Sequence, residues 1–205
     1  MDLYRAPDGR DRCGWAADGP GMLDYHDTEW GFPVVDDRRL FEKVSLEGFQ
    51  SGLSWRTILT KRPAFREVFD DFDFTVVAGY GDADVERLVT DARIVRHRGK
   101  IEAVIDNARR ALDLVAETGS LARYFWRWEI PDGEIATPAT VSTTASSIAM
   151  AKDLKRRGWR FVGPTTAFAF MQAMGLVNDH APGCVTRDDV AAARARFTAP
   201  VSAVP

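Results

Sequence analysis

The chain has 205 residues, of which 45% are hydrophobic and 28% are charged, and it contains 12 Phe and 6 Trp. Such a chain can bury a sizeable core, as one domain or as two small lobes, which excludes a disordered protein and a disulfide-rich miniprotein. The formal net charge is −3 at pH 7. The chain therefore has no overall positive field that attracts nucleic acid, and a contact with phosphates has to come from a local basic patch.

The beginning of the chain, residues 1–12, is polar and of mixed charge, so no signal peptide is expected there. The longest weakly polar stretch, residues 161–177, contains Gly163, Pro164 and Gln172 and is too short and too polar to cross a bilayer. Two cysteines in a chain without a leader favour a reducing compartment. We therefore expect a cytoplasmic protein without membrane contact.

Apolar residues recur at helical spacing along nearly the whole sequence, so the predicted fold class is all-α. The first clear helix begins after a cap at Asp36 or Asp37 and places Leu40, Phe41 and Val44 on one face. The other predicted helices cover residues 55–61 (capped by Ser54 and ended before Pro63), 64–69, 75–78 (opened by Asp73), 83–91 (opened by Asp82), 100–117 (ended by Gly119), 121–128, 147–157 and 165–174.

Strand signals are few. Pro131, Gly133 and Pro138 indicate a loop over residues 130–141, and its last two residues are expected to pair with residues 160–162 as short strands. An Ala-rich helical stretch and a proline-containing end that frays are predicted after the last cysteine.

The domain organisation follows from these elements. Residues 13–184 are expected to form the main domain, with two helical lobes that share one core. Residues 1–12 are then an N-terminal extension, and residues 185–205 are a tail that is partly helical and then flexible.

Four of the five cysteine and histidine residues form two pairs, Cys13 with His26 and His180 with Cys184. Two thiolates and two imidazoles make a closed tetrahedral set for a structural Zn²⁺ ion, which would join the two ends of the chain. The alternative is two buried cysteines with unrelated histidines, and the spacing alone does not separate the two interpretations.

Glu47 continues the apolar face of the helix that carries Leu40 and Val44, and Gly48 leaves space beside it. A carboxylate on a core-facing stripe is costly unless it has a partner, so such a residue commonly lines a pocket. The alternative is a slight roll of the helix that pairs Glu47 with an arginine at the surface.

Aromatic residues crowd the same regions, with Trp15, Tyr25 and Trp30 around the first cysteine–histidine pair and Trp55 two turns after Glu47. Flat rings beside a carboxylate hold a planar cation well. The alternative function of each tryptophan is packing in a helical core.

Two basic runs stand out in this acidic chain, at residues 93–100 and 152–160. The first opens the long predicted helix, where free amides and the helix dipole favour a phosphate. A phosphate contact is therefore a better prediction for His97 than a metal. A solvated face is the alternative for either run.

Five segments resemble the 3-methyladenine DNA glycosylase I family. They read Arg-Cys-Gly-Trp at 12–15, Tyr-His-Asp-Thr-Glu-Trp-Gly at 25–31, Leu-Glu-Gly-Phe-Gln-Ser-Gly-Leu-Ser-Trp at 46–55, Ile-Val-Arg-His-Arg-Gly-Lys-Ile at 94–101, and a run from Phe-Val-Gly at 161–163 to Asn-Asp-His at 178–180. The resemblance extends from Cys13 to Cys184. It implies a helix-hairpin-helix glycosylase fold whose ends are joined by one structural zinc ion, held by Cys13, His26, His180 and Cys184.

The resemblance also implies the residues that act on DNA. Glu47 and Tyr25 are the catalytic residues of a pocket for the flipped base, and the base-binding residues are Trp15, Trp30, Trp55 and Met22. The DNA-binding residues are Gln50 and Leu53 in a loop and Arg96, His97, Arg98, Gly99 and Lys100 in a hairpin. The sequence departs from the family at Met22 and Phe168, where tyrosine is common, and at Arg93, where glycine is common.

The residues and the resemblance together predict a monofunctional glycosylase that hydrolyses the bond of 3-methyladenine to its sugar in alkylated double-stranded DNA and works as a monomer. An N3-alkylated adenine is cationic and leaves readily, so the enzyme flips it out, accepts its hydrogen bonds at Glu47, orients it with Tyr25 and releases the free base. A lyase would need a pocket lysine. None of the five lysines, Lys43, Lys61, Lys100, Lys152 and Lys155, lies in the pocket motifs.

Two other functions stay open at this stage. One is a non-catalytic lesion binder, which only Met22 supports, and the other is a zinc-stabilised scaffold whose Trp-rich groove binds a protein. A Glu47→Gln substitution separates them from a glycosylase, because it should abolish base excision and spare folding.

Overall fold

The computed structural model describes residues 2–131, 133–135, 137–138 and 140–200. The α-helices in these ranges are α1 (Met22–Thr28), α2 (Asp37–Gln50), α3 (Trp55–Val68), α4 (Phe74–Val77), α5 (Asp82–Thr90), α6 (Arg98–Thr118), α7 (Leu121–Trp126), α8 (Ala145–Arg156), α9 (Pro164–Ala173) and α10 (Val185–Arg196). Two short 3-10 helices are η1 (Gly14–Ala17) and η2 (Asp70–Phe72), and two strands are β1 (Leu3–Arg5) and β2 (Asp11–Cys13). The prediction of a helical fold is confirmed, with one small sheet in addition.

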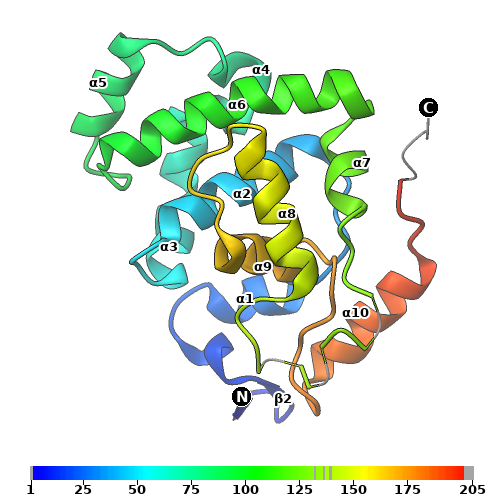
Figure 1. Cartoon of the computed structure of the whole chain (residues 1–205). Coiled ribbons are helices and arrows are strands. Elements are labelled where there is room, and N and C mark those ends of the chain that lie inside the picture. Colours follow the sequence, from blue (N-terminus) through cyan, green and yellow to red (C-terminus); the bar gives the residue numbers. More distant parts are fainter. Residues whose placement is uncertain (1, 132, 136, 139, 201–205) are drawn as a thin grey trace.

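Helix α2 runs through the centre of the molecule, with α6 across it and α9 beside it (Figure 1). Its cap is the predicted one, because the carboxylate of Asp36 accepts a hydrogen bond from the backbone N–H of Arg39 at 2.8 Å. Every residue from Leu40 to Phe49 is buried. A polar side chain near the end of this helix therefore lies inside the protein.

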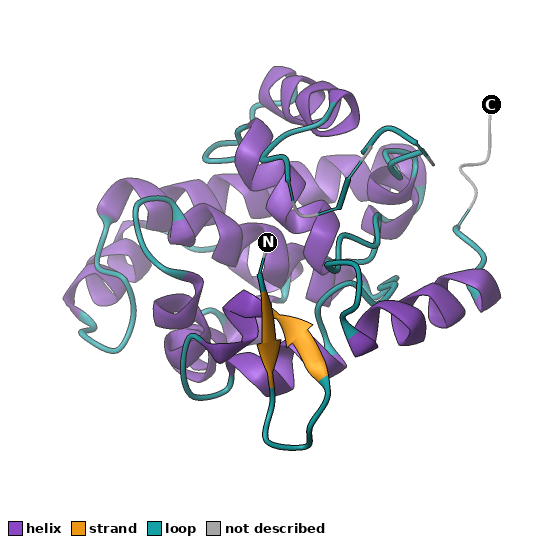
Figure 2. Cartoon of the chain, turned by 90° about the horizontal axis from the view of Figure 1, so that it is seen from below, coloured by secondary structure: helices purple, strands orange, loops and turns teal. Residues whose placement is uncertain are grey.

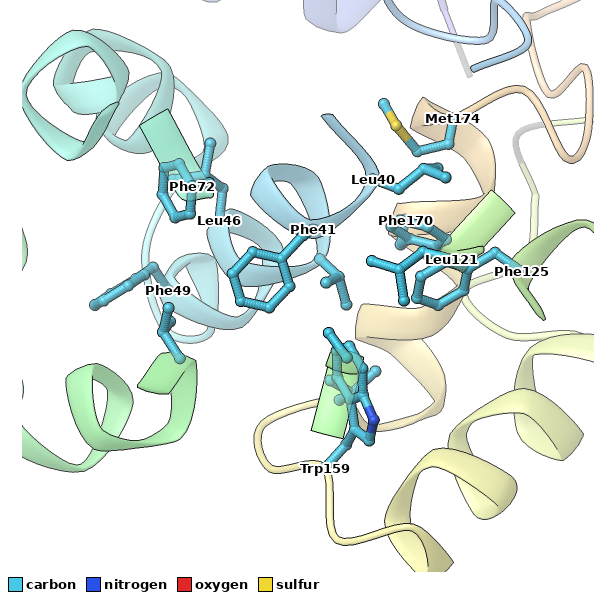
Figure 3. Close-up of a cluster of buried hydrophobic side chains, with 14 of the residues drawn as sticks. Leu40, Phe41, Leu46, Phe49, Phe72, Leu121, Phe125, Trp159, Phe170 and Met174 are labelled. Carbon is cyan, nitrogen blue, oxygen red and sulfur yellow. The ribbon is translucent and has the colours of Figure 1, made fainter. Parts of the chain in front are cut away.

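The main core is one continuous cluster, in which most of the largest fully buried side chains are phenylalanines. Figure 3 shows Phe125 of α7 beside Phe170 of α9, with Phe41 of α2 and Trp159 in the same cluster. The rings of Phe125 and Phe170 lie 4.5 Å apart. A second group of aromatic contacts joins the end of α2 to α3 and η2, with Phe49 and Phe65 4.6 Å apart. This packing fixes α2 from both sides.

Helix α3 continues through Pro63 to Val68, so the predicted stop before Pro63 is wrong. Proline removes one helical hydrogen bond, but Arg62 and Phe65 on either side of it are both buried. Tertiary packing therefore outweighs the local preference. The cap by Ser54 is confirmed, since its hydroxyl accepts a bond from Thr57 N–H at 3.2 Å.

The strands lie at the N-terminus, where β1 pairs antiparallel with β2 (Figure 2). The buried Arg12 joins this hairpin to the end of α1 through an ion pair with Asp27 at 3.0 Å. The domain boundary expected between residues 12 and 13 falls inside β2. The hairpin and α10, from opposite ends of the chain, lie side by side (Figure 1).

The predicted strands at residues 140–141 and 160–162 are wrong, because neither segment belongs to a sheet. The side-chain amide of Asn107 accepts a hydrogen bond from the backbone N–H of Arg160 at 2.8 Å and donates one to the Arg160 carbonyl at 3.0 Å. Phe161 has a φ of +56°, in the left-handed region that a strand excludes. Side-chain hydrogen bonds from α6 thus replace strand pairing at this segment.

The separate helix predicted at residues 64–69 is the second half of α3, and the remaining predicted helices are present with ends within two residues of the predicted ones. Gly119 ends α6 in the left-handed conformation, as expected. Helix α1 has no counterpart among the predictions. Helix α10 matches the expected Ala-rich helix, and Phe197 after it packs on Trp126 with 4.3 Å between ring centroids. Of the proline-containing end that is predicted to fray, residues 201–205 lie outside the described residues.

Candidate functional site

A cavity of about 480 Å³ opens between α1, the end of α2, the start of α3 and α9. Its lining residues are Trp15, Asp18, Met22, Tyr25, Trp30, Glu47, Gln50, Ser54, Trp55, Arg56, Ala169 and Gln172. The structure thus brings together all six residues predicted for the pocket, although they come from η1, α1, α2, α3 and the turn after α1. Phe168, one of the departures from the family pattern, is buried and does not line this cavity.

Local sequence explains how these side chains converge. Met22 and Tyr25 are three residues apart on α1 and therefore share a face. Glu47 lies in the last turn of α2, and Trp55 is the first residue of α3 after a short turn. The cavity is the space left where the two helices meet α1.

The aromatic rings form a wall around the cavity. Trp15 meets Trp30 edge to face at 5.1 Å between ring centroids, and Tyr25 lies 5.3 Å from Trp55 in a tilted arrangement. Trp15 also contacts Tyr25 at 6.2 Å. Such a wall can hold a flat, polarised ring by stacking.

Glu47 is 5% exposed, and its Oε1 lies 3.0 Å from the Nζ of Lys43, one turn earlier on α2. The alternative of a rolled helix with a surface arginine partner is therefore wrong. Lys43 also donates a hydrogen bond to the hydroxyl of Tyr25 at 2.5 Å, and its Nζ lies 3.3 Å from the centre of the Trp55 ring.

Lys43 is not among the residues that line the cavity; it lies directly behind the wall, in contact with the three lining residues Tyr25, Glu47 and Trp55. The sequence carries one signal for this placement, because residues four apart on a helix are neighbours and Lys43 precedes Glu47 by four. Gln172 lines the cavity and is a second residue that the site prediction leaves out. Its side-chain amide donates a hydrogen bond to the carboxylate of Asp179 at 2.6 Å.

Burial sets the protonation of this group. It lowers the pKa of Lys43 to about 8, against the opposing effect of Glu47. Burial and the charge of Glu47 raise the pKa of Tyr25 well above its usual value. At neutral pH Lys43 is therefore an ammonium ion and Tyr25 a neutral phenol with one proton to donate.

A buried ion cluster braces the helices that form the pocket. Arg62 of α3 bonds Glu42 of α2 at 2.8 Å and Glu29 after α1 at 2.8 Å. Arg66 adds a second bond to Glu42 at 2.7 Å. These bonds hold α1, α2 and α3 in fixed relation, and so fix the mutual positions of Tyr25, Glu47 and Trp55 as well.

The four candidate zinc ligands come together behind the aromatic wall. Donor atoms of Cys13, His26 and Cys184 lie within 4.8 Å of one another, and the ring of His180 is 4.9 Å from that of His26. The Nε2 of His180 is buried and has no hydrogen-bond partner among the described residues. A Cβ at Gly31 would lie 2.8 Å from the ring of His180, so only glycine fits there.

Both imidazoles are oriented as metal ligands usually are. The Nδ1 of His26 lies 2.7 Å from a carboxylate oxygen of Asp27, which leaves Nε2 beside the sulfur of Cys184 at 3.5 Å. The Nδ1 of His180 lies 3.1 Å from the side-chain oxygen of Asn178. Burial lowers the pKa of His180 to about 4, so the ring is neutral at pH 7. The residues present fit a zinc ion.

In the basic segment at the start of α6, residues 93–100, one predicted phosphate contact is not at the surface. Lys100 is buried, and its Nζ donates to the carbonyls of Phe49 and Ser51 at 2.9 and 2.6 Å. Its charge therefore caps the end of α2 instead of facing a phosphate, which corrects that prediction. His97 caps α6 by accepting from the Lys100 backbone N–H at 3.2 Å.

The rest of the segment is at the surface. Arg96 and Arg98 are exposed, Gly99 is half-buried, and Arg98 pairs with Glu86 at 2.8 Å. The loop after α2 presents Leu53 with 43% of its surface exposed, while Gln50 lines the cavity. Lys100 links the two regions through its bonds to the end of α2.

A cavity walled by aromatic rings around one buried carboxylate is suited to hold a flat heterocycle. The family model described as methyladenine glycosylase matches residues 15–187. The chain therefore belongs to the methyladenine glycosylase family.

Named relatives agree with this family. DNA-3-methyladenine glycosylase 1 of Escherichia coli (strain K12) is 46% identical over 178 residues, which cover 85% of this chain and 95% of that protein. A crystal structure of 3-methyladenine DNA glycosylase I matches with a TM-score of 0.80 at 46% identity, over 85% of this chain and 98% of the other. The enzyme of that name from Staphylococcus aureus, whose structure concerns 3-methyladenine recognition, matches at 34% identity with a TM-score of 0.80, over 86% and 96%.

Proposed function

We propose that this protein is a DNA glycosylase that removes 3-methyladenine from alkylated double-stranded DNA by hydrolysis, as a step of base excision repair. The observation that carries the proposal is the buried carboxylate of Glu47 inside an aromatic cavity, in a chain whose relatives are named for this activity. A base inside a duplex cannot reach such a cavity, so the lesion has to be flipped out of the stack.

The chemistry follows from the charge of the lesion. The bond between the sugar and N9 breaks with its electron pair going to N9, so the cationic base leaves as a neutral molecule and positive charge develops on the sugar. Water then adds to the sugar carbon and loses a proton, which leaves an abasic site. Glu47 accepts a hydrogen bond from the base, Tyr25 donates one, and Trp15, Trp30 and Trp55 surround the ring.

The same geometry supports hydrolysis without lyase activity. A lyase forms a Schiff base through a free amine. The side chain of Lys43 is 4% exposed, and its amine contacts the carboxylate of Glu47, the hydroxyl of Tyr25 and the ring of Trp55. It is therefore not free to attack the sugar.

The duplex contacts we propose are the exposed residues beside the cavity. Arg96, His97, Arg98 and Gly99 lie at the start of α6, where the helix dipole favours a phosphate. Leu53 with Gln50 would fill the gap in the stack, because Leu53 is exposed and Gln50 reaches the cavity. The helix-hairpin-helix assignment of this region, the monomeric state and the cytoplasmic location belong to the same proposal. No helix within the described residues is long and apolar enough to span a bilayer.

We also propose one structural zinc ion on Cys13, His26, His180 and Cys184. Its contribution is folding energy, since all four positions are taken by protein ligands and none stays open for a substrate. In this arrangement the ion ties the hairpin and α10 to α1.

The test is release of free methylated bases from methylated duplex DNA, identified by chromatography. We expect 3-methyladenine to be released and 7-methylguanine to be retained. Glu47→Gln should lower release strongly without loss of folding, whereas the control Glu67→Gln alters a carboxylate that is 66% exposed and should be neutral. A folded, zinc-loaded protein that releases no base would refute the proposal and favour a lesion binder or a protein-binding scaffold.

A further inference from the structure

A buried ammonium ion lies directly behind the wall of the pocket that we propose for a cationic base. Lys43 is 3% exposed and touches three pocket residues at once: Glu47 at 3.0 Å, the Tyr25 hydroxyl at 2.5 Å and the Trp55 ring at 3.3 Å from its centre. The positive charge of Lys43 opposes the binding of a cationic base, so the residue must serve the site in another way. Its contacts with Tyr25 and Glu47 indicate this role.

An ammonium group has three donors and no acceptor. Because Lys43 donates to the oxygen of Tyr25, the single proton of that hydroxyl must point to another acceptor. The described residues offer none, and Tyr25 lines the cavity. Lys43 likewise pairs with Oε1 of Glu47. The other carboxylate oxygen, Oε2, has no hydrogen-bond partner among the described residues.

We propose that Lys43 is the positioning residue that sets the base preference of the pocket, because it makes Tyr25 a donor and Glu47 an acceptor toward the bound base. This inference rests on the proposed function. The pocket then accepts a base that shows a donor and an acceptor side by side. Adenine does so with N6–H₂ and N7, whereas guanine shows two acceptors, O6 and N7, on the same edge. The guanine O6 would face the carboxylate of Glu47.

The same contacts predict how the preference depends on pH. Burial lowers the pKa of Lys43 to about 8. A neutral Lys43 amine has a lone pair, so above pH 8 it can accept the Tyr25 proton and the donor toward the base is lost. The charged and titratable groups around Lys43 come from three helices. They are Tyr25 of α1, Glu29 directly after α1, Glu42 and Glu47 of α2, and Arg62 of α3.

The experiment compares release of 3-methyladenine and 3-methylguanine from the same methylated duplex by the full-length wild type and three variants. Lys43→Met keeps the length of the side chain and removes charge and donors, while Lys43→Gln keeps an N–H donor without the charge. Lys152→Met is the matched control on an exposed lysine of α8. We expect Lys43→Met to lower the ratio of adenine to guanine release on the order of tenfold, Lys43→Gln to retain more of it, and Lys152→Met to leave it unchanged.

A second readout is the pH dependence of that ratio, which a merely structural residue would not change. In the wild type the ratio should fall as the pH rises through about 8, and in Lys43→Met it should be low and flat. Wild-type release of 3-methyladenine with an unchanged ratio in Lys43→Met, or a wild-type ratio constant from pH 7 to about 10, overturns the inference and leaves the proposed function intact. Release of no base by the wild type overturns both. If Lys43→Met does not fold, Lys43→Gln and the wild-type pH series decide the question.

Discussion

Replacement of Glu42 by alanine tests how far the buried ion cluster holds the pocket helices together. Glu42 is 4% exposed and accepts bonds from Arg62 at 2.8 Å and from Arg66 at 2.7 Å. Burial opposes its ionisation, but the two arginines outweigh burial and hold the pKa of Glu42 below its usual value. The alanine variant leaves Arg62, itself 9% exposed, with Glu29 as its remaining carboxylate.

The expected cost follows from the half-satisfied arginine. Breaking one side of a buried ion pair costs about 3–5 kcal/mol. Because Arg62 keeps two bonds to Glu29, at 3.0 and 2.8 Å, we expect the lower end, about 3 kcal/mol. For a chain of this length that corresponds to a fall in melting temperature of about 6–12 °C.

The assay is urea and thermal unfolding followed by circular dichroism, with Glu67→Ala as the matched control. Glu67 pairs with Arg93 at 2.8 Å but is 66% exposed, so its loss should cost about 0–1 kcal/mol. Equal effects of the two substitutions would refute the idea that burial makes the Glu42 cluster important. The loss of 3-methyladenine release in Glu42→Ala should follow the loss of folded protein.

Three more predictions follow. Purified protein should contain one zinc ion per chain, and Cys184→Ser should lower zinc content and melting temperature together; an unchanged zinc content would contradict the assigned ligands. Although burial acts against ionisation, hydrogen bonds from two arginines lower the pKa of Asp153 to about 2. Its ionised form therefore adds stability at neutral pH that is lost as the pH falls from about 4 to 2, and Asp153→Asn should remove this part of the acid sensitivity in unfolding curves at pH 6 and pH 3. Lys100→Met leaves two carbonyls at the end of α2 without their donor, so it should destabilise the protein by about 1–3 kcal/mol and weaken duplex binding, with no change in affinity for free 3-methyladenine.

Periodicity and capping residues predict most of the helices correctly because their signals are local. Asp36, Ser54 and Gly119 each cap a helix as the sequence indicates. The pocket residues can be found in advance for a related reason. A carboxylate on an apolar face, as at Glu47, conflicts with its own helix, and such conflicts gather at functional sites.

The wrong predictions concern residues whose fate is decided by distant parts of the chain. Pro63 stays inside α3 because the neighbouring side chains are buried by other helices. Lys100 is predicted to contact a phosphate, yet it caps carbonyls at the end of another helix, α2. A lysine in a sequence shows that a charge is present, and only the fold shows which oxygen receives it.

The candidate zinc ligands and the pocket share one set of aromatic contacts, which gives a structural ion a consequence for base binding. The ring of His26 lies 5.0 Å from Trp15, and that of His180 lies 4.5 Å from Trp30, both edge to face. The two tryptophans are the wall of the cavity on that side. An ion that fixes both histidines would also fix this wall, so loss of the ion should loosen base binding. Residues near the two ends of the chain would thus support a pocket whose lining comes mainly from residues 15–56, with Ala169 and Gln172 added by α9.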